Sequence, residues 1–235
     1  MRKHVKILAM KLHNTLFGIL PLSILLGCSN PADKVPAAAV KAPTNAGSEE
    51  ASAPTPDSSG RYFAFGPSSA TIAFIGSKVT GRHNGGFSKF AGEFRAADGR
   101  LADTGNKVVI DTSSLFADND RLTGHLKSPD FFNVAQFPTA TFVSTAIQPK
   151  GTNWVVTGNL TLHGVTKQIS FPAQVQMTDE GVNVNTQFVL NRFDFGLIYP
   201  GKANDLIRKE VVLRLNVKAA PGRADFSSIQ QTAQL

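Results

Sequence analysis

The chain has 235 residues, of which 42% are hydrophobic and 17% are charged, which suffices for one globular domain and additional segments. Its formal net charge is +7, but the first 27 residues contribute four basic side chains and no acidic one. The remainder carries 20 basic and 17 acidic residues, which argues against a nucleic-acid-binding protein. The single cysteine, Cys28, excludes an intrachain disulfide, so stability has to come from a packed core.

The N-terminus is typical of an export signal. Residues 2–11 are basic, and residues 15–27 form an apolar run shorter than the roughly 20 residues of a membrane-spanning helix. Cys28 directly follows Leu-Leu-Gly, which resembles the cleavage box of bacterial lipoproteins, whose cysteine is lipidated. We therefore expect residues 1–27 to be a lipoprotein signal peptide, with an ordinary signal peptide as the alternative. By the same resemblance, Ser29 favours the periplasmic face of the outer membrane.

Residues 28–59 are predicted to be a lipidated, disordered tether. They are rich in proline and alanine and contain few large apolar residues, so they cannot bury enough surface to offset the entropy of ordering. The folded domain is expected over residues 60–222, and residues 223–235 are predicted to be a polar tail.

Within that domain the pattern is one of short strands separated by turns. Apolar residues alternate with a period of two, which indicates half-buried strands, over the ranges 69–77, 107–112, 153–163, 168–177, 182–190 and 211–217. The glycine-rich stretch 81–86 is expected to be a turn. A series of antiparallel strands favours a barrel, because closure removes exposed edges, and eight strands leave room for side chains or one small ligand.

One stretch, residues 118–143, interrupts the β pattern. Leu122 and Leu126 are four residues apart and share a helical face, and three residues that can cap a helix precede them. Ser128 and Pro129 are expected to begin a second helical turn. The sequence therefore predicts an all-β protein with a short helical insertion.

The chain resembles the YceI-like family of polyisoprenoid-binding proteins over roughly residues 60–220. The resemblance rests on four segments: SATIAFIGSKVTGRHNGGFSKFAG from Ser69, DRLTGHLKSPDFFNVAQFPTATF from Asp120, GNLTLHGVTKQISF from Gly158, and residues 191–217 with RFDFG and LIRKEVVLRLNV. It implies an extended eight-stranded antiparallel lipocalin-like barrel whose lumen takes a long isoprenoid-type chain. Many members carry a His-Ser pair before the first strand and another histidine near its end. This chain has Ser68-Ser69 and Gly76-Ser77-Lys78 there.

Large apolar residues on the predicted inward faces are the candidates for ligand binding. Periodicity alone does not separate cavity lining from core filling, and the resemblance favours the cavity. An indole N–H needs a partner when buried, which places the tryptophan of this set near the mouth. The candidate lining residues are Ile72, Phe74, Leu122, Leu126, Phe131, Phe132, Phe142, Trp154, Val156, Phe188 and Phe195.

Polar residues suggest other sites less strongly. His83, His125 and His163 lack the spacing of a metal site, so no metal is predicted, and the last two are expected to bond buried backbone. The aspartates at 118, 120 and 130 suit helix caps better than catalysis. The basic residues around the loop at 199–205 are expected to form a solvated face, with contact to an anionic head group as the alternative: Arg192, Lys202, Arg208 and Lys209.

The sequence predicts a non-enzymatic carrier that holds an apolar chain, such as a polyisoprenoid, an isoprenoid quinone or a lipid. It needs no cofactor, and its partners are this ligand and the membrane that holds its lipid anchor, with a homodimer possible. A structural or stress-response envelope protein with a filled barrel is the second hypothesis. A hydrolase is the third, although no nucleophile elbow, phosphate-binding glycine loop or CxxC motif is present.

Overall fold

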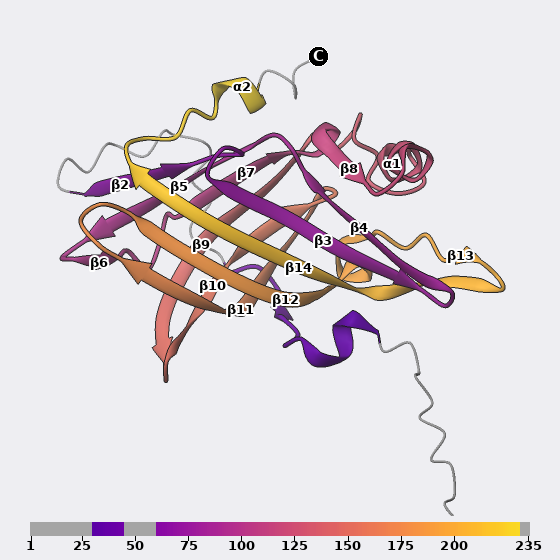
Figure 1. Cartoon of the computed structure of the whole chain (residues 1–235), viewed down its shortest axis with the longest axis horizontal. Helices are drawn as coiled ribbons and strands as arrows, with labels where there is room; N and C mark the ends of the chain where they lie inside the picture. Colours follow the sequence, from indigo (N-terminus) through magenta and orange to yellow (C-terminus); the bar gives the residue numbers. More distant parts are fainter. Residues whose placement is uncertain (1–29, 45–59, 231–235) are drawn as a thin grey trace, which may run out of the picture.

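Eight antiparallel strands form a closed ring in the computed structural model, which describes residues 30–44 and 60–230 (Figure 1). Each strand pairs with the next, and β14 returns to β2 where Ala220 faces Ala64. The predicted eight-stranded antiparallel barrel is thereby confirmed. In order around the ring, the strands are β2 (Arg61–Phe65), β5 (Phe90–Ala97), β7 (Lys107–Asp111), β9 (Thr139–Lys150), β10 (Asn153–Leu162), β11 (Val165–Met177), β12 (Val182–Asn191) and β14 (Asp205–Pro221).

Further elements extend this ring at one end. Along the edge that pairs with β2, β14 also pairs with β3 (Ala70–Lys78), and the sheet continues from β3 to β4 (Gly81–Phe87) and β8 (Leu115–Ala117). Helix α1 (Asp120–Lys127) follows β8 and lies at the same end of the molecule as the β3–β4 hairpin (Figure 1). The remaining elements are short: β6 (Arg100–Leu101), β13 (Gly201–Lys202), η2 (Thr112–Ser114), η3 (Arg192–Phe195) and α2 (Ser227–Gln230).

The glycine-rich stretch 81–86 is strand β4, so the expectation of a turn was wrong. Gly85 lies opposite Phe74 of β3, and a Cβ at Gly85 would come 2.3 Å from Cζ of the Phe74 ring. Gly85 therefore leaves room for the aromatic ring on the neighbouring strand, which a side chain would displace, and it is not a turn residue. Glycine composition alone does not distinguish these two uses.

The described part of the predicted tether is ordered against the barrel, which corrects the prediction of disorder. Residues 30–44 contain η1 (Pro31–Lys34) and β1 (Ala39–Lys41), and we call this segment the strap. β1 pairs with β11, and Ala38 N donates to Val189 O of β12 at 2.8 Å. Ala32 and Val35 pack on an apolar cluster on the outside of the sheet. The few apolar residues of the strap are enough to order it, because each of them packs on apolar residues that the barrel provides.

The strap lies where β11 and β12 separate. Their ladder covers only four pairs, from Gln174–Asn185 to Met177–Val182, and stops beside Pro172. Proline has no N–H to donate to a ladder, and the Thr186 hydroxyl donates to Pro172 O instead, at 2.6 Å. Beyond this point the strap bonds both strands, so it spans the seam of the barrel (indigo in Figure 1).

The start of the predicted polar tail also packs on the barrel. Arg223 Nε lies 2.8 Å from a carboxylate oxygen of Glu93, and Ile229 is buried against Ala91 and Val109. The expectation of a tail from residue 223 was therefore wrong for residues 223–229. Among the described residues, no helix is both long enough and apolar enough to cross a membrane.

Candidate ligand cavity

A cavity of about 660 Å³ occupies the barrel between the inward faces of its strands and α1. Eight of the eleven predicted residues line it: Ile72, Phe74, Leu122, Leu126, Phe131, Phe132, Phe142 and Phe188. Lining places these side chains where a ligand would lie, while their contact with a ligand stays a prediction.

Trp154, Val156 and Phe195 do not line the cavity. Val156 and Phe195 are buried in the main core, and Trp154 packs against that core while partly exposed. The expected position of the Trp154 indole at the mouth was therefore wrong. Strand alternation correctly put Trp154 and Val156 on one face, but it does not tell the filled part of a barrel from the open part.

Several lining residues were missed by the sequence reasoning. Phe171 stacks on Phe188 with ring centroids 4.2 Å apart and planes inclined by 14°, and it lies 5.7 Å from the Phe142 ring. Its alternation with Ile169 in β11 was the signal that could have found it. Others supply the wall from neighbouring strands, namely Phe87, Val108, Ile110, Leu160, Leu162, Ile169, Leu190, Leu213 and Leu215.

Helix α1 and the turns after it close over one end of the cavity. Asn119 is the N-cap, because its side-chain oxygen accepts from Leu122 N at 2.8 Å. Leu122 and Leu126 both face the cavity, as their spacing predicted. After Ser128 the chain forms turns rather than the expected second helix, and these turns stack Phe131 on Phe132 at 5.8 Å.

Arg192 lies in the wall at the same end, which corrects its assignment to a solvated face. Its residue exposure is only 3%. The guanidinium donates to four backbone carbonyls, those of Leu197, Tyr199, Ile207 and Arg208. It lies 5.4 Å from the centroid of the Phe131 ring. Burial lowers the pKa of Arg192 from its ordinary value, because the charged form loses hydration.

Two aspartates near this end are engaged by other groups. Asp205 accepts from Lys78 Nζ at 2.6 Å and from Thr80, and the bond from Lys78 is the main cause that lowers the pKa of Asp205. Asp118 lies 2.9 Å from Nδ1 of His83, and this bond is the main cause that lowers its pKa. Asp118 also accepts from Asn84 N, so it joins β4 to the start of α1.

The three histidines occupy different environments and do not form one site. His83 and His125 face the cavity, and the His125 ring meets Tyr199 edge-on at 4.7 Å. His163 lies in the β10–β11 turn and packs on Phe137 at 4.4 Å. These ring contacts replace the backbone bonds expected for the last two. No cluster of three or more histidine, cysteine or acidic side chains suited to a metal occurs among residues 30–44 and 60–230.

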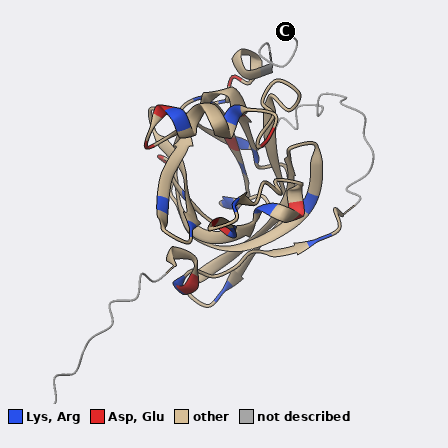
Figure 2. Cartoon of the chain, turned by 90° about the vertical axis from the view of Figure 1, so that its right-hand side faces the viewer, with Lys and Arg blue, Asp and Glu red and all other residues tan. Residues whose placement is uncertain are grey.

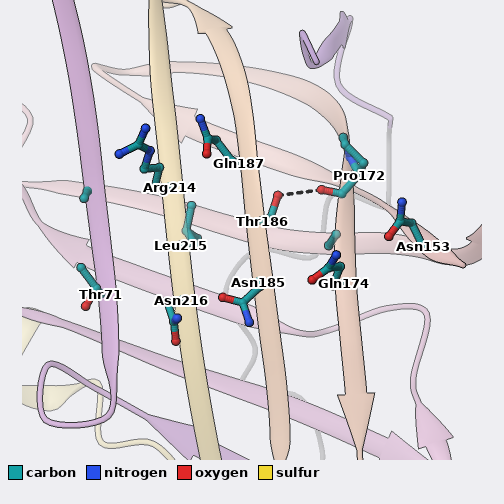
Figure 3. A pocket seen from close by; sticks show the side chains of 12 residues that line it. Thr71, Asn153, Pro172, Gln174, Asn185, Thr186, Gln187, Arg214, Leu215 and Asn216 are labelled. Carbon is teal, nitrogen blue, oxygen red and sulfur yellow. Dashed lines mark hydrogen bonds between the residues drawn. The ribbon is translucent and has the colours of Figure 1, made fainter. Parts of the chain in front are cut away.

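A second hollow of about 610 Å³ lies on the outer face of β3, β14, β12 and β11 (Figure 3). Uncharged polar side chains dominate it, including cross-strand neighbours such as Gln174, Asn185, Asn216 and Thr71. Alternation along the strands explains the contrast, since the inward residues between these positions are apolar.

The model of the YceI-like domain matches residues 63–219. The chain belongs to the YceI-like family. A UPF0312 protein of Vibrio parahaemolyticus is 41% identical over 91 residues, which cover 38% of this chain and 48% of that protein. A UPF0312 protein of Pseudomonas putida is 33% identical over 140 residues, which cover 54% of this chain and 73% of that protein. The chain thus spans about half the length of the first relative.

Two solved structures share the fold of this YceI-like protein. BcnA of Burkholderia cenocepacia is 21% identical, with a TM-score of 0.58 over 64% of this chain and 96% of that chain. A polyisoprenoid-binding domain from Saccharophagus degradans is 18% identical, with a TM-score of 0.55 over 68% of this chain and 98% of that chain. At these identities the likeness shows the fold.

Proposed function

We propose that this YceI-like protein is a non-enzymatic carrier that holds one long apolar chain, such as a polyisoprenoid, an isoprenoid quinone or a lipid. The observation that carries the proposal is the cavity of about 660 Å³ with its wall of aromatic and aliphatic side chains. Pockets of this size and character commonly hold small apolar ligands. The neighbour from Saccharophagus degradans is a polyisoprenoid-binding domain, which supports the same ligand class.

The cavity argues against the hypothesis of a filled structural barrel. Protein interiors contain few voids larger than a water molecule, because each void forfeits dispersion contacts. A space of about 660 Å³ beside Phe142, Phe171 and Phe188 therefore favours a bound ligand, which would restore the missing contacts. Burial of apolar surface would supply affinity at about 25 cal/mol per Å², less the cost of ordering the ligand.

The proposal includes a lipid anchor at Cys28 and residence at the periplasmic face of the outer membrane. Cys28 and the signal peptide lie outside the described residues, so the support for this part is the sequence alone. Two or three acyl chains would hold the protein firmly at a membrane. Replacement Cys28→Ala should move the protein from the membrane to the soluble envelope fraction, and unchanged membrane retention would refute the anchor.

The carrier hypothesis is tested by the ligand that copurifies. The chain from Ser29 onward keeps every described residue, and its organic extract should contain a stoichiometric apolar compound by mass spectrometry. Phe142→Asp places a charge in the cavity wall and should abolish retention, whereas Phe116→Asp, at an exposed aromatic position outside the cavity, should not. Thermal melts would show whether both variants remain folded. An empty barrel that binds no added isoprenoid, quinone or fatty acid would overturn the proposal.

A further inference from the structure

The charged lining residues of the cavity gather at one end. Apart from Thr141 of β9, the polar lining residues come from the end of β3, the start of β4, α1 with its N-cap, η3, the loop that follows η3, and the β13–β14 hairpin. These segments lie together, since Val79 N of the β3–β4 hairpin donates to Leu206 O of the β13–β14 hairpin at 3.2 Å. Tyr199, in the loop after η3, accepts a hydrogen bond from Arg192 through its backbone carbonyl, and its ring contacts His125 of α1. The cavity is therefore amphipathic along its length, and we call this part its polar end.

The charges at the polar end do not balance. Lys78, Arg121, Arg192 and Lys202 line the cavity with one carboxylate, Asp205, among them. Asp205 is fully engaged, with Oδ2 on Lys78 and Oδ1 on Thr80. Within the described ranges, no carboxylate lies within 4.0 Å of the other three cations. Figure 2 looks at this end of the barrel and shows Lys and Arg positions around the ring, with Asp and Glu positions among them.

Arg192 makes this imbalance costly. A guanidinium has five N–H donors, and here four bonds to backbone carbonyls are formed. Carbonyl dipoles orient the group but do not cancel its charge, and a buried charge without a counter-ion is unfavourable. Arg121 and Lys202 are exposed, so they can turn toward a group at the mouth without leaving water.

We propose that the ligand carries an acidic head group, a carboxylate or a phosphate, which lies at the polar end between Arg192, Arg121 and Lys202. The apolar chain then extends toward Phe142, Phe171 and Phe188 at the other end. An anion in this position meets charge-assisted donors and offsets the buried charge of Arg192. This inference rests on the proposed function, which concerns the chain, and adds the chemistry of the head.

The test compares three ligands with one C20 isoprenoid chain: geranylgeraniol, geranylgeranoic acid and geranylgeranyl monophosphate. Delipidated protein from Ser29 onward is titrated with each by calorimetry at low salt. Bonds to charged groups predict that the acids bind at least about tenfold more tightly than the alcohol. If only the monophosphate binds more tightly than the alcohol, the polar end is specific for phosphate. If both acids gain equally, the polar end accepts any compact anionic head group.

Variants locate the effect. The double substitution Arg121→Gln with Lys202→Gln should reduce the preference for the acids severalfold and leave the dissociation constant of the alcohol unchanged. The matched control, Arg208→Gln with Lys209→Gln, removes two exposed cations beside the same hairpin that do not line the cavity, and it should leave the preference intact. Equal affinity for the alcohol and the acids would overturn the inference of an acidic head group, and so would equal effects of the two double variants. Neither result would contradict the proposed carrier function. Failure of all three ligands to bind would overturn the carrier as well.

Discussion

Arg192 shows how one residue can escape sequence reasoning. The sequence places it in a loop beside other basic residues, where a solvated position is the usual outcome. In the structure its guanidinium ties η3 to the start of β14 through backbone carbonyls. Those carbonyls belong to residues 5 to 16 positions further along the chain, so no local sequence pattern indicates that they accept from Arg192. The residue type was visible, but its partners depend on the fold.

Replacing Arg192 should destabilise the protein. Arg192→Met keeps much of the apolar stem but leaves four carbonyls without their donor, so the free energy of unfolding should fall by about 3 kcal/mol or more. Arg192→Lys should restore only part of the lost stability, because an ammonium group lacks the planar arrangement of N–H donors that a guanidinium offers. Urea unfolding measures both, with Arg208→Met as the exposed control that should change little. Equal stability of Arg192→Met and Arg208→Met would contradict the structural role.

Asp111 predicts a dependence of stability on pH. Burial raises the pKa of Asp111, but hydrogen bonds from Ser113 and Lys89 outweigh it, so the pKa lies below its ordinary value of 3.8. A lowered folded-state pKa contributes stability above the unfolded value, and this contribution is lost as the pH falls through the folded value.

The comparison of wild type with Asp111→Asn should therefore depend on pH. At pH 7 the variant should be less stable by about 1.5 kcal/mol or more, because it loses charge-assisted bonds. The difference should shrink as the pH falls below 3.8, because the unfolded chain then takes up a proton at Asp111, and it should be lost as the pH falls through the lower pKa of the folded state. Urea unfolding at pH 7, 5 and 3 measures this, and the exposed Asp103→Asn should show almost no difference at any pH. A difference that stays constant down to pH 3 would argue against the ionised role of Asp111.

At the scale of elements, the strands and α1 were predictable because their patterns are local. Alternation gave β3, β7, β10 to β12 and β14, and the Leu122–Leu126 spacing with a capping amide gave α1. The strap was not predictable, since its order depends on partners distant in sequence, and β4 was missed because its glycines are typical of a turn. β1 pairs with β11 across more than a hundred residues, and the seam that it covers begins at Pro172.

Removal of the strap should destabilise the barrel locally. A chain that begins at residue 45 loses the β1–β11 ladder, two bonds to β12 and the packing of Val35 on Ile75 and Val212. The free energy of unfolding should fall by about 2–4 kcal/mol relative to a chain that begins at Ser29. Hydrogen exchange should accelerate at residues 168–170 of β11 more than at β9. Uniform protection in both chains would mean that the strap adds nothing to the seam.

At the scale of the whole molecule, the barrel was predictable, and the family resemblance implied a lumen, but the strand pattern did not show which inward residues would line it. The alternation of β strands fixes which side chains point inward, but their volumes and the closing position of α1 decide how much space they fill. Trp154, Val156 and Phe195 fill the core, whereas Phe74, Phe142 and Phe188 leave it open. Trp154 and Val156 alternate inward along β10 just as Phe142 does along β9 and Phe188 along β12, so the sequence pattern does not separate core filling from cavity lining.

A cavity of fixed volume predicts a limit on chain length. Each methylene that enters an apolar site contributes up to about 0.8 kcal/mol, or roughly fourfold in affinity, until the space is full. In a series of fatty acids the dissociation constant should therefore fall steadily with chain length and then level off. Leu213→Trp adds volume to the cavity wall and should shift this plateau to shorter chains. Leu206→Trp, at an exposed position outside the cavity, should leave it in place, because it changes no volume inside the barrel. Calorimetric titration of both variants across the series measures the shift, and affinity that is independent of chain length would indicate binding at the surface instead.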